Sequence, residues 1–92
     1  MFYLVCFDIV DDKDRRKAVK VLKEYGVWVQ KSVFECANLT EKRFLRMKDQ
    51  LDGTIDQNVD TVRYYFLCGA CLERVEHTGI GEGPLVEDYK VV

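Results

Sequence analysis

One carboxylate stands out because it directly follows an apolar segment. Asp8 comes after six apolar residues, 2–7, and falls on the same strand face as Leu4 and Cys6. A carboxylate in such surroundings is costly unless a cation or a hydrogen-bond donor compensates it. Two copies brought together by a symmetric dimer would repel each other unless a proton or a divalent metal lay between them. Magnesium commonly takes one or two carboxylates and keeps its waters. Asp8 is therefore a candidate metal ligand. The alternative is that it marks the solvent end of the strand and caps the next helix.

A dense group of cations follows this carboxylate. Six Lys and Arg residues occupy the eleven positions 13–23, with a single acid, Asp14, among them. Arg16, Lys20 and Lys23 recur at i, i+4 and i+7, a spacing that puts them on one face of a helix. Such a face can track a phosphate backbone, and solvated lysines on an amphipathic helix produce the same pattern. The candidate phosphate-binding residues are Lys13, Arg15, Arg16, Lys17, Lys20 and Lys23.

The four cysteines give a weaker signal. Cys6 and Cys36 lie in strand-like apolar segments, where a thiol behaves as a small buried hydrophobe. Cys68 and Cys71 form a CxxC motif, but no second closely spaced Cys or His pair completes a four-ligand zinc site. Core or incidental thiols are favoured over redox or metal chemistry, and both alternatives stay open.

The aromatic residues and the histidine also have structural interpretations. His77 is the only histidine, and no motif ties it to a nucleophile. Trp28 and Phe34 are interpreted as core or dimer contacts in preference to stacking platforms.

Length and composition bound the architecture that positions these residues. A chain of 92 residues with 48% hydrophobic and 33% charged residues predicts one soluble domain, 1–92, and excludes intrinsic disorder. The longest apolar segment is too short for a membrane span, and no signal peptide is recognised, so we expect a cytoplasmic protein without a membrane partner. The net charge of −2 hides an asymmetry, because residues 1–46 carry +3 and residues 47–92 carry −5. This asymmetry hints at a surface that faces a polyanion.

Hydrophobic periodicity predicts a β, α, β, β, α, β order. The first expected elements are a strand over 2–10 and a helix over 13–25, which begins at a cap on Asp11 or Asp12 and ends before Gly26. A short hairpin, or else one bent strand, is expected over 27–36, followed by a helix from a Thr40 cap to Gly53 and a strand over 60–68. This order predicts an α+β, ferredoxin-like sandwich, in which both helices cover one face of a four-stranded antiparallel sheet. The predicted core spans about 1–70. An extra C-terminal strand over 73–78 and a Gly-rich tail complete the region 71–92.

Two helices leave the other sheet face bare, although the first and last strands are apolar on both faces. An exposed apolar face of this kind is most often buried by a symmetric partner. We therefore expect a homodimer, with the C-terminal segment at a sheet edge or across the partner subunit.

The sequence resembles the Cas2 family of CRISPR-associated proteins over about its whole length. The motifs that carry the resemblance are YLVCFDIV at 3–10, the pairs Asp11-Asp12 and Arg15-Arg16, then Gly26, VQxSVFEC at 29–36, RYYF at 63–66 and VEH at 75–77. Each motif is loose by itself, but their order and spacing are specific.

The resemblance implies a homodimer that works with the CRISPR adaptation integrase to capture foreign double-stranded DNA as new spacers, a step of antiviral defence. It also implies a magnesium-dependent endonuclease that hydrolyses single-stranded RNA or double-stranded DNA. Asp8 matches the family's metal-binding aspartate, one from each subunit, and would be the catalytic residue. Arg15 and Arg16 match its basic positions, and Ser32 and Phe34 match its supporting SVF segment.

One residue departs from the family pattern. Many members carry Tyr before the aspartate, where this chain has Phe7, which removes a hydroxyl donor and weighs against hydrolysis more than against the structural role. The rival hypotheses are a non-catalytic ferredoxin-like dimer that binds a small ligand or a protein, and a thiol-redox or zinc module at Cys68 and Cys71.

Overall fold

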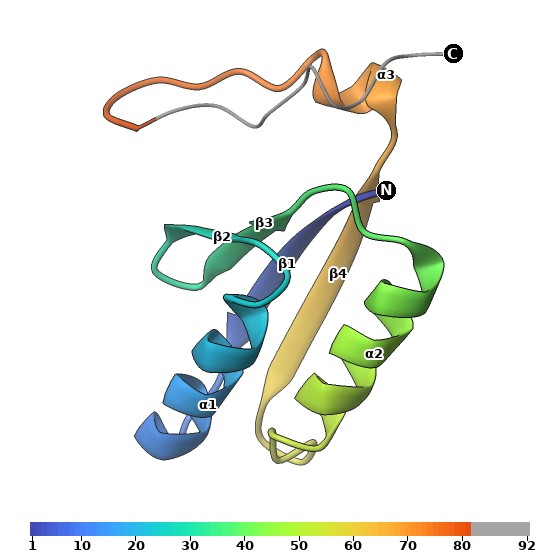
Figure 1. The fold of residues 1–92 in the computed structure, drawn as a ribbon. Coiled ribbons are helices and arrows are strands. Elements are labelled where there is room, and N and C mark those ends of the chain that lie inside the picture. Colours follow the sequence, from blue (N-terminus) through green and yellow to red (C-terminus); the bar gives the residue numbers. More distant parts are fainter. Residues whose placement is uncertain (82–92) are drawn as a thin grey trace.

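The computed structural model describes residues 1–81, and their elements follow the predicted order (Figure 1). The predicted segments at 82–92 lie outside the described residues. The elements are β1 (Phe2–Asp8), α1 (Asp12–Leu22), β2 (Val27–Gln30), β3 (Val33–Cys36), α2 (Glu41–Asp52), β4 (Thr61–Leu67) and α3 (Gly69–Leu72).

The four strands form one antiparallel sheet in the order β2-β3-β1-β4. Both long helices lie on the same side of it (Figure 1). The register places Leu4 of β1 opposite Glu35 of β3 and Tyr65 of β4. Since directly opposed residues share a sheet face, these three side chains lie on the face away from the helices. The predicted ferredoxin-like sandwich is confirmed.

The core lies between the sheet and the two helices. Alternate residues of β1, Val5 and Phe7, pack there with Phe34 of β3. Ala18 and Leu22 of α1 complete this side of the core, and α2 contributes from the other helix. The apolar stripe of each helix is thus buried, and its opposite face is left to solvent.

Local capping explains where both helices begin. The Asp11 carboxylate accepts hydrogen bonds from the backbone N–H groups of Lys13 and Asp14, and the bond from Asp14 contributes most to lowering the pKa of Asp11. The Thr40 hydroxyl accepts the N–H of Arg43 at 3.1 Å, which begins α2. Both predicted caps are confirmed.

Gly26 has a different role from the one expected. A Cβ at this position would meet the carbonyl oxygen of Glu35 and lie 2.6 Å from Sγ of Cys36. The cap of α1 is Lys23. Glycine is therefore needed at residue 26 because β3 passes very close, rather than as the residue that ends the helix.

The strand predicted over 73–78 does not form within this subunit, and its pairing across a partner subunit stays a prediction. The chain forms the short helix α3 and then continues without regular structure to residue 81. A strand needs a neighbouring edge to pair with, and this segment pairs with none of the four strands. Leu72 of α3 and Phe2 are each 1% exposed, although both lie outside the main core cluster. No helix among the described residues is long and apolar enough to cross a membrane.

Candidate nucleic-acid interface

A groove of about 530 Å³ runs between α1 and the β2–β3 hairpin. It is lined by five cations, one aromatic residue and one aliphatic residue: Arg15, Arg16, Val19, Lys20, Lys23, Trp28 and Lys31. No acidic residue lines it. We call this feature the basic groove. In a chain whose net charge is −2, it is a local surface that attracts anions.

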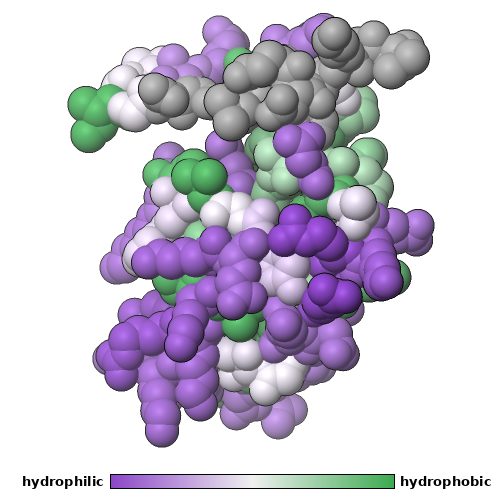
Figure 2. All heavy atoms as spheres, in the orientation of Figure 1, coloured by the Kyte–Doolittle hydropathy of each residue, from purple (hydrophilic) through white to green (hydrophobic). Residues whose placement is uncertain are grey.

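The amphipathic pattern of α1 produces most of this groove. Ala18 and Leu22 are buried, so the opposite side of α1 faces outward. Arg16, Lys20 and Lys23 share one side of the helix and line the groove. Hydrophilic side chains cover the lower left of the molecule, where α1 lies (Figure 2). Four of the six predicted phosphate-binding residues line the groove. The other two, Lys13 and Lys17, are exposed on α1 but do not line it.

The cations of the groove differ in their partners. Arg15 forms an exposed ion pair with Asp12, which offsets part of its charge. Within residues 1–81, Arg16, Lys20 and Lys31 form no ion pair. These three side chains are the ones best placed to exchange solvent counterions for phosphate.

Trp28 supplies an aromatic wall. Its ring stacks on that of Phe34 with centroids 5.8 Å apart and an interplanar angle of 7°. Its indole N–H donates to the carbonyl of Lys31 at 3.2 Å, and Nζ of Lys23 lies 5.4 Å from the ring centroid. The residue is 47% exposed, so Trp28 is not a core residue, whereas the alternative of a dimer contact stays a prediction. Sequence patterns missed Lys31 and the placement of Trp28, because the groove forms only when the hairpin packs beside α1.

Asp8 lies exposed at the end of β1, on the open sheet face with Leu4 and Cys6, as predicted. Within residues 1–81 its carboxylate makes no hydrogen bond or ion pair. Its Cα partner is Thr61, and Arg63, the partner of Cys6, is the next cation along that face. The described residues contain no group of three or more potential metal ligands. Within one subunit, Asp8 is therefore a single carboxylate that leaves further ligand positions to water or to a second copy.

The proposed supporting residues, Ser32 and Phe34, lie in the hairpin turn and in the buried core. Ser32 is in the hairpin turn, and its carbonyl accepts the N–H of Phe7 at 3.0 Å. Phe34 is fully buried beneath Trp28 and does not reach either surface. Phe7 is 4% exposed and packs in the core, on the face opposite Asp8. A tyrosine hydroxyl at residue 7 would leave the strand on the helix side, so its absence says little about the chemistry at Asp8.

The CxxC thiols are close but have no further ligand. Sγ of Cys68 and Sγ of Cys71 are 3.5 Å apart, and both residues are exposed. The backbone N–H of Cys71 lowers the pKa of the Cys68 thiol, and the side-chain hydrogen bond that the Cys71 thiol makes with Cys68 raises the pKa of Cys71. Two sulfur ligands do not make a structural zinc site.

The comparisons with known proteins agree on one family. The family model described as "CRISPR associated protein Cas2" matches residues 1–75. A relative from Chloroflexus aurantiacus, named CRISPR-associated endoribonuclease Cas2 1, is 41% identical over 85 residues, which cover 91% of this chain and 88% of the relative.

Two solved structures are similar in both fold and sequence. Streptococcus pyogenes Cas2 has a TM-score of 0.76 and 36% identity, covering 86% of this chain and 100% of the other. A chain in a partial Cas6-RT-Cas1–Cas2 complex has a TM-score of 0.71 and 33% identity, covering 83% and 88% of the two chains.

Proposed function

This chain belongs to the Cas2 family of CRISPR-associated proteins, and we propose that it is a nucleic-acid-binding subunit of CRISPR adaptation. In this role it bridges copies of the Cas1 integrase and holds double-stranded DNA. The Cas1 partnership is supported by the similarity to a chain of a complex whose name includes Cas1 and Cas2.

The observation that carries the proposal is the basic groove. It gathers five cations without a carboxylate in a chain that is acidic as a whole. Lys and Arg side chains on a surface groove neutralise backbone phosphates whatever the base sequence, so binding is expected to depend strongly on salt and little on sequence. The exposed Lys13 and Lys17 extend the same positive surface along α1.

We propose that two copies pair through the open sheet face. Leu4 and Cys6 are half-buried there, and Tyr65 is still 44% exposed. Burial raises the pKa of Glu35 on the same face, even in a single subunit. Sedimentation of the Tyr65→Glu variant tests this contact. A dimeric wild type and a monomeric variant support it, whereas a monomeric wild type contradicts it.

The second part of the proposal is hydrolysis of phosphodiester bonds, with single-stranded RNA or double-stranded DNA as substrate. It is supported by relatives that are named endoribonucleases. Asp8 fits Mg²⁺ because its carboxylate is exposed and unpaired within residues 1–81, and because Mg²⁺ needs only one or two carboxylates and keeps several waters. Dimerisation would supply a second Asp8 to the same ion.

The residues of this chain would then have distinct tasks. Asp8 would hold the ion at the end of β1. When bound, Mg²⁺ would supply activation of a water and neutralisation of charge that develops on the phosphate. Hydrogen bonding of Phe7 N–H to the Ser32 carbonyl fixes this end of the strand against the hairpin. The cations of α1 bind the flanking phosphates.

Two experiments test the proposal, one for each part. The protein should bind labelled duplex DNA and co-purify with a Cas1 protein from the same organism, and absence of both would refute the adaptation role. For hydrolysis, Asp8→Asn should abolish Mg²⁺-dependent cleavage, while the exposed carboxylate variant Glu41→Gln on α2 should cleave normally. Equal cleavage by the Asp8→Asn and wild-type proteins would show that the activity belongs to another site or to a contaminant.

A further inference from the structure

We propose that Trp28 is a stacking platform for an unpaired base, so that the basic groove binds single-stranded nucleic acid as well as duplex phosphates. This inference rests on the proposed nucleic-acid function and deepens it, since it names a class of substrate for a defined part of the surface.

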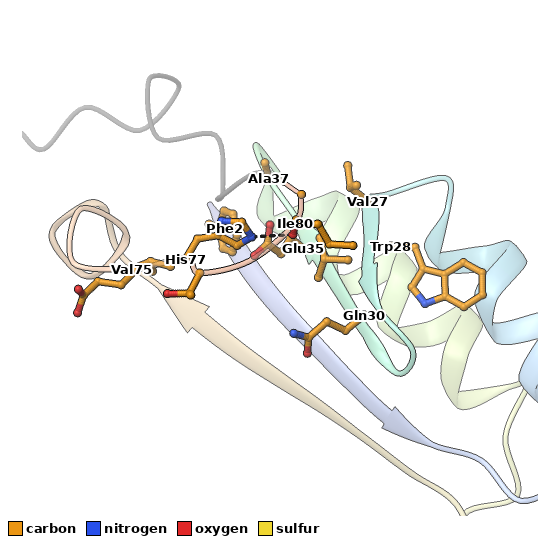
Figure 3. A pocket seen from close by; sticks show the side chains of 13 residues that line it. Phe2, Val27, Trp28, Gln30, Glu35, Ala37, Val75, His77 and Ile80 are labelled. Carbon is orange, nitrogen blue, oxygen red and sulfur yellow. Dashed lines mark hydrogen bonds between the residues drawn. The ribbon is translucent and has the colours of Figure 1, made fainter.

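The ring of Trp28 is held in a fixed orientation. It stacks on Phe34, which is fully buried, and its indole N–H is bonded to the Lys31 carbonyl. The side chain is 47% exposed and lines the groove, so part of the ring is accessible to a ligand there. Figure 3 shows the Trp28 side chain pointing away from His77 and Ile80. An indole that is rigid, supported from below and half-exposed is well prepared for stacking.

Cations surround this platform. Lys31 follows it in the hairpin, and Arg16 and Lys20 line the same groove from α1. Nζ of Lys23 is 5.4 Å from the ring centroid, a cation–π contact at an exposed site. Such a contact is weaker than stacking of a base on an aromatic ring, so a base can displace the ammonium. The displaced Lys23 then remains beside the phosphate of the same nucleotide.

This combination favours an unpaired strand. In a duplex the faces of the bases are covered by their neighbours, so a tryptophan on a protein surface contacts only the backbone. In a single strand each base can swing out and stack while its phosphates meet the cations. An acidic peptide would satisfy the cations but would leave the aromatic platform unused.

The chain contains a single tryptophan and five tyrosines, so emission excited at a wavelength that tyrosine does not absorb reports on this site alone. Titration of the full-length protein with oligothymidylate should quench or shift the Trp28 emission. An abasic oligonucleotide of equal length and charge should bind more weakly and leave the emission nearly unchanged. Equal affinity and equal quenching with the two oligonucleotides would overturn the proposal. So would a polyglutamate peptide that binds as tightly as oligothymidylate, because the groove would then be an acidic-peptide site.

Variants separate this inference from the general function. In anisotropy measurements with labelled oligothymidylate, Trp28→Leu should weaken binding by roughly 5- to 150-fold, the range expected for one stacked base. Binding of blunt duplex DNA should be unchanged. The Trp28→Phe variant keeps an aromatic ring above Phe34 and should lie between wild type and Trp28→Leu, which makes it the check if the leucine variant unfolds. A wild-type protein that does not bind duplex DNA would refute the proposed function. Duplex binding without any response of Trp28 to single strands would refute only the stacking platform.

Discussion

Removal of two cations from the basic groove should change the salt dependence of duplex binding by a predictable amount. Arg16 and Lys20 line the groove and form no ion pair within residues 1–81. Each phosphate contact contributes about −0.9 to the slope of log K against log salt for duplex DNA. The double variant Arg16→Gln, Lys20→Gln should therefore make the slope less negative by about 1.8 for each subunit that touches the DNA. Between about 50 and 200 mM salt, the wild type should lose about 12-fold more affinity per subunit than the variant does.

The assay is fluorescence anisotropy of a labelled duplex at a series of salt concentrations. The matched control is the double variant Lys42→Gln, Arg74→Gln, which removes the same charge from exposed residues outside the groove. It should keep the wild-type slope. The assignment of phosphate contacts to α1 is refuted if the groove variant keeps the wild-type slope. It is also refuted if the slope of the control variant changes as much as that of the groove variant.

Three further predictions concern residues whose hydroxyl or thiol groups have contrasting surroundings. The Tyr64 hydroxyl is buried without a partner among the described residues, so Tyr64→Phe should raise the free energy of unfolding, measured in urea, by about 1 kcal/mol. Tyr25→Phe loses a 2.9 Å hydrogen bond and should lower the free energy of unfolding by about 1 kcal/mol. Changes of the same sign in the two variants would contradict this. Burial raises the pKa of Cys36 to about 11, above about 9 for the unfolded chain, so the contribution of Cys36 to stability should be intact below pH 9 and be lost as pH rises through 11, a fall of about 3 kcal/mol at most. Urea titrations at several pH values should show that Cys36→Ala flattens this fall. The pKa of Cys68 is lowered and that of Cys71 raised, so mass spectrometry should find Cys68 alkylated first by iodoacetamide, and equal rates would contradict the asymmetry.

Much of the fold could be predicted from the sequence because its signals are local. The caps at Asp11 and Thr40 satisfy backbone N–H groups two or three residues away, so a short pattern contains the whole interaction. The alternation in β4 likewise puts Val62 and Tyr64 on one face of the strand, and the structure packs that face against the core. The position of Asp8 at the end of an apolar strand followed from the same kind of pattern.

The features that were missed depend on contacts between distant segments. Gly26 is required by the passage of β3, which no property of its neighbours in sequence reveals. Trp28 and Lys31 join the cations of α1 only because the hairpin packs beside that helix. The segment 73–78 has a strand-like composition but no edge to pair with in this subunit, since pairing is decided by what lies beside a strand.

Lysine footprinting tests most directly whether the basic groove is where nucleic acid binds. The protein is acetylated with and without saturating duplex DNA, and modification of each lysine is measured by mass spectrometry. Lys20, Lys23 and Lys31 line the groove and should be protected by the DNA, whereas Lys42, exposed on α2, should react equally in both samples. Protection of Lys42 with full reactivity at the three groove lysines would contradict the proposed interface.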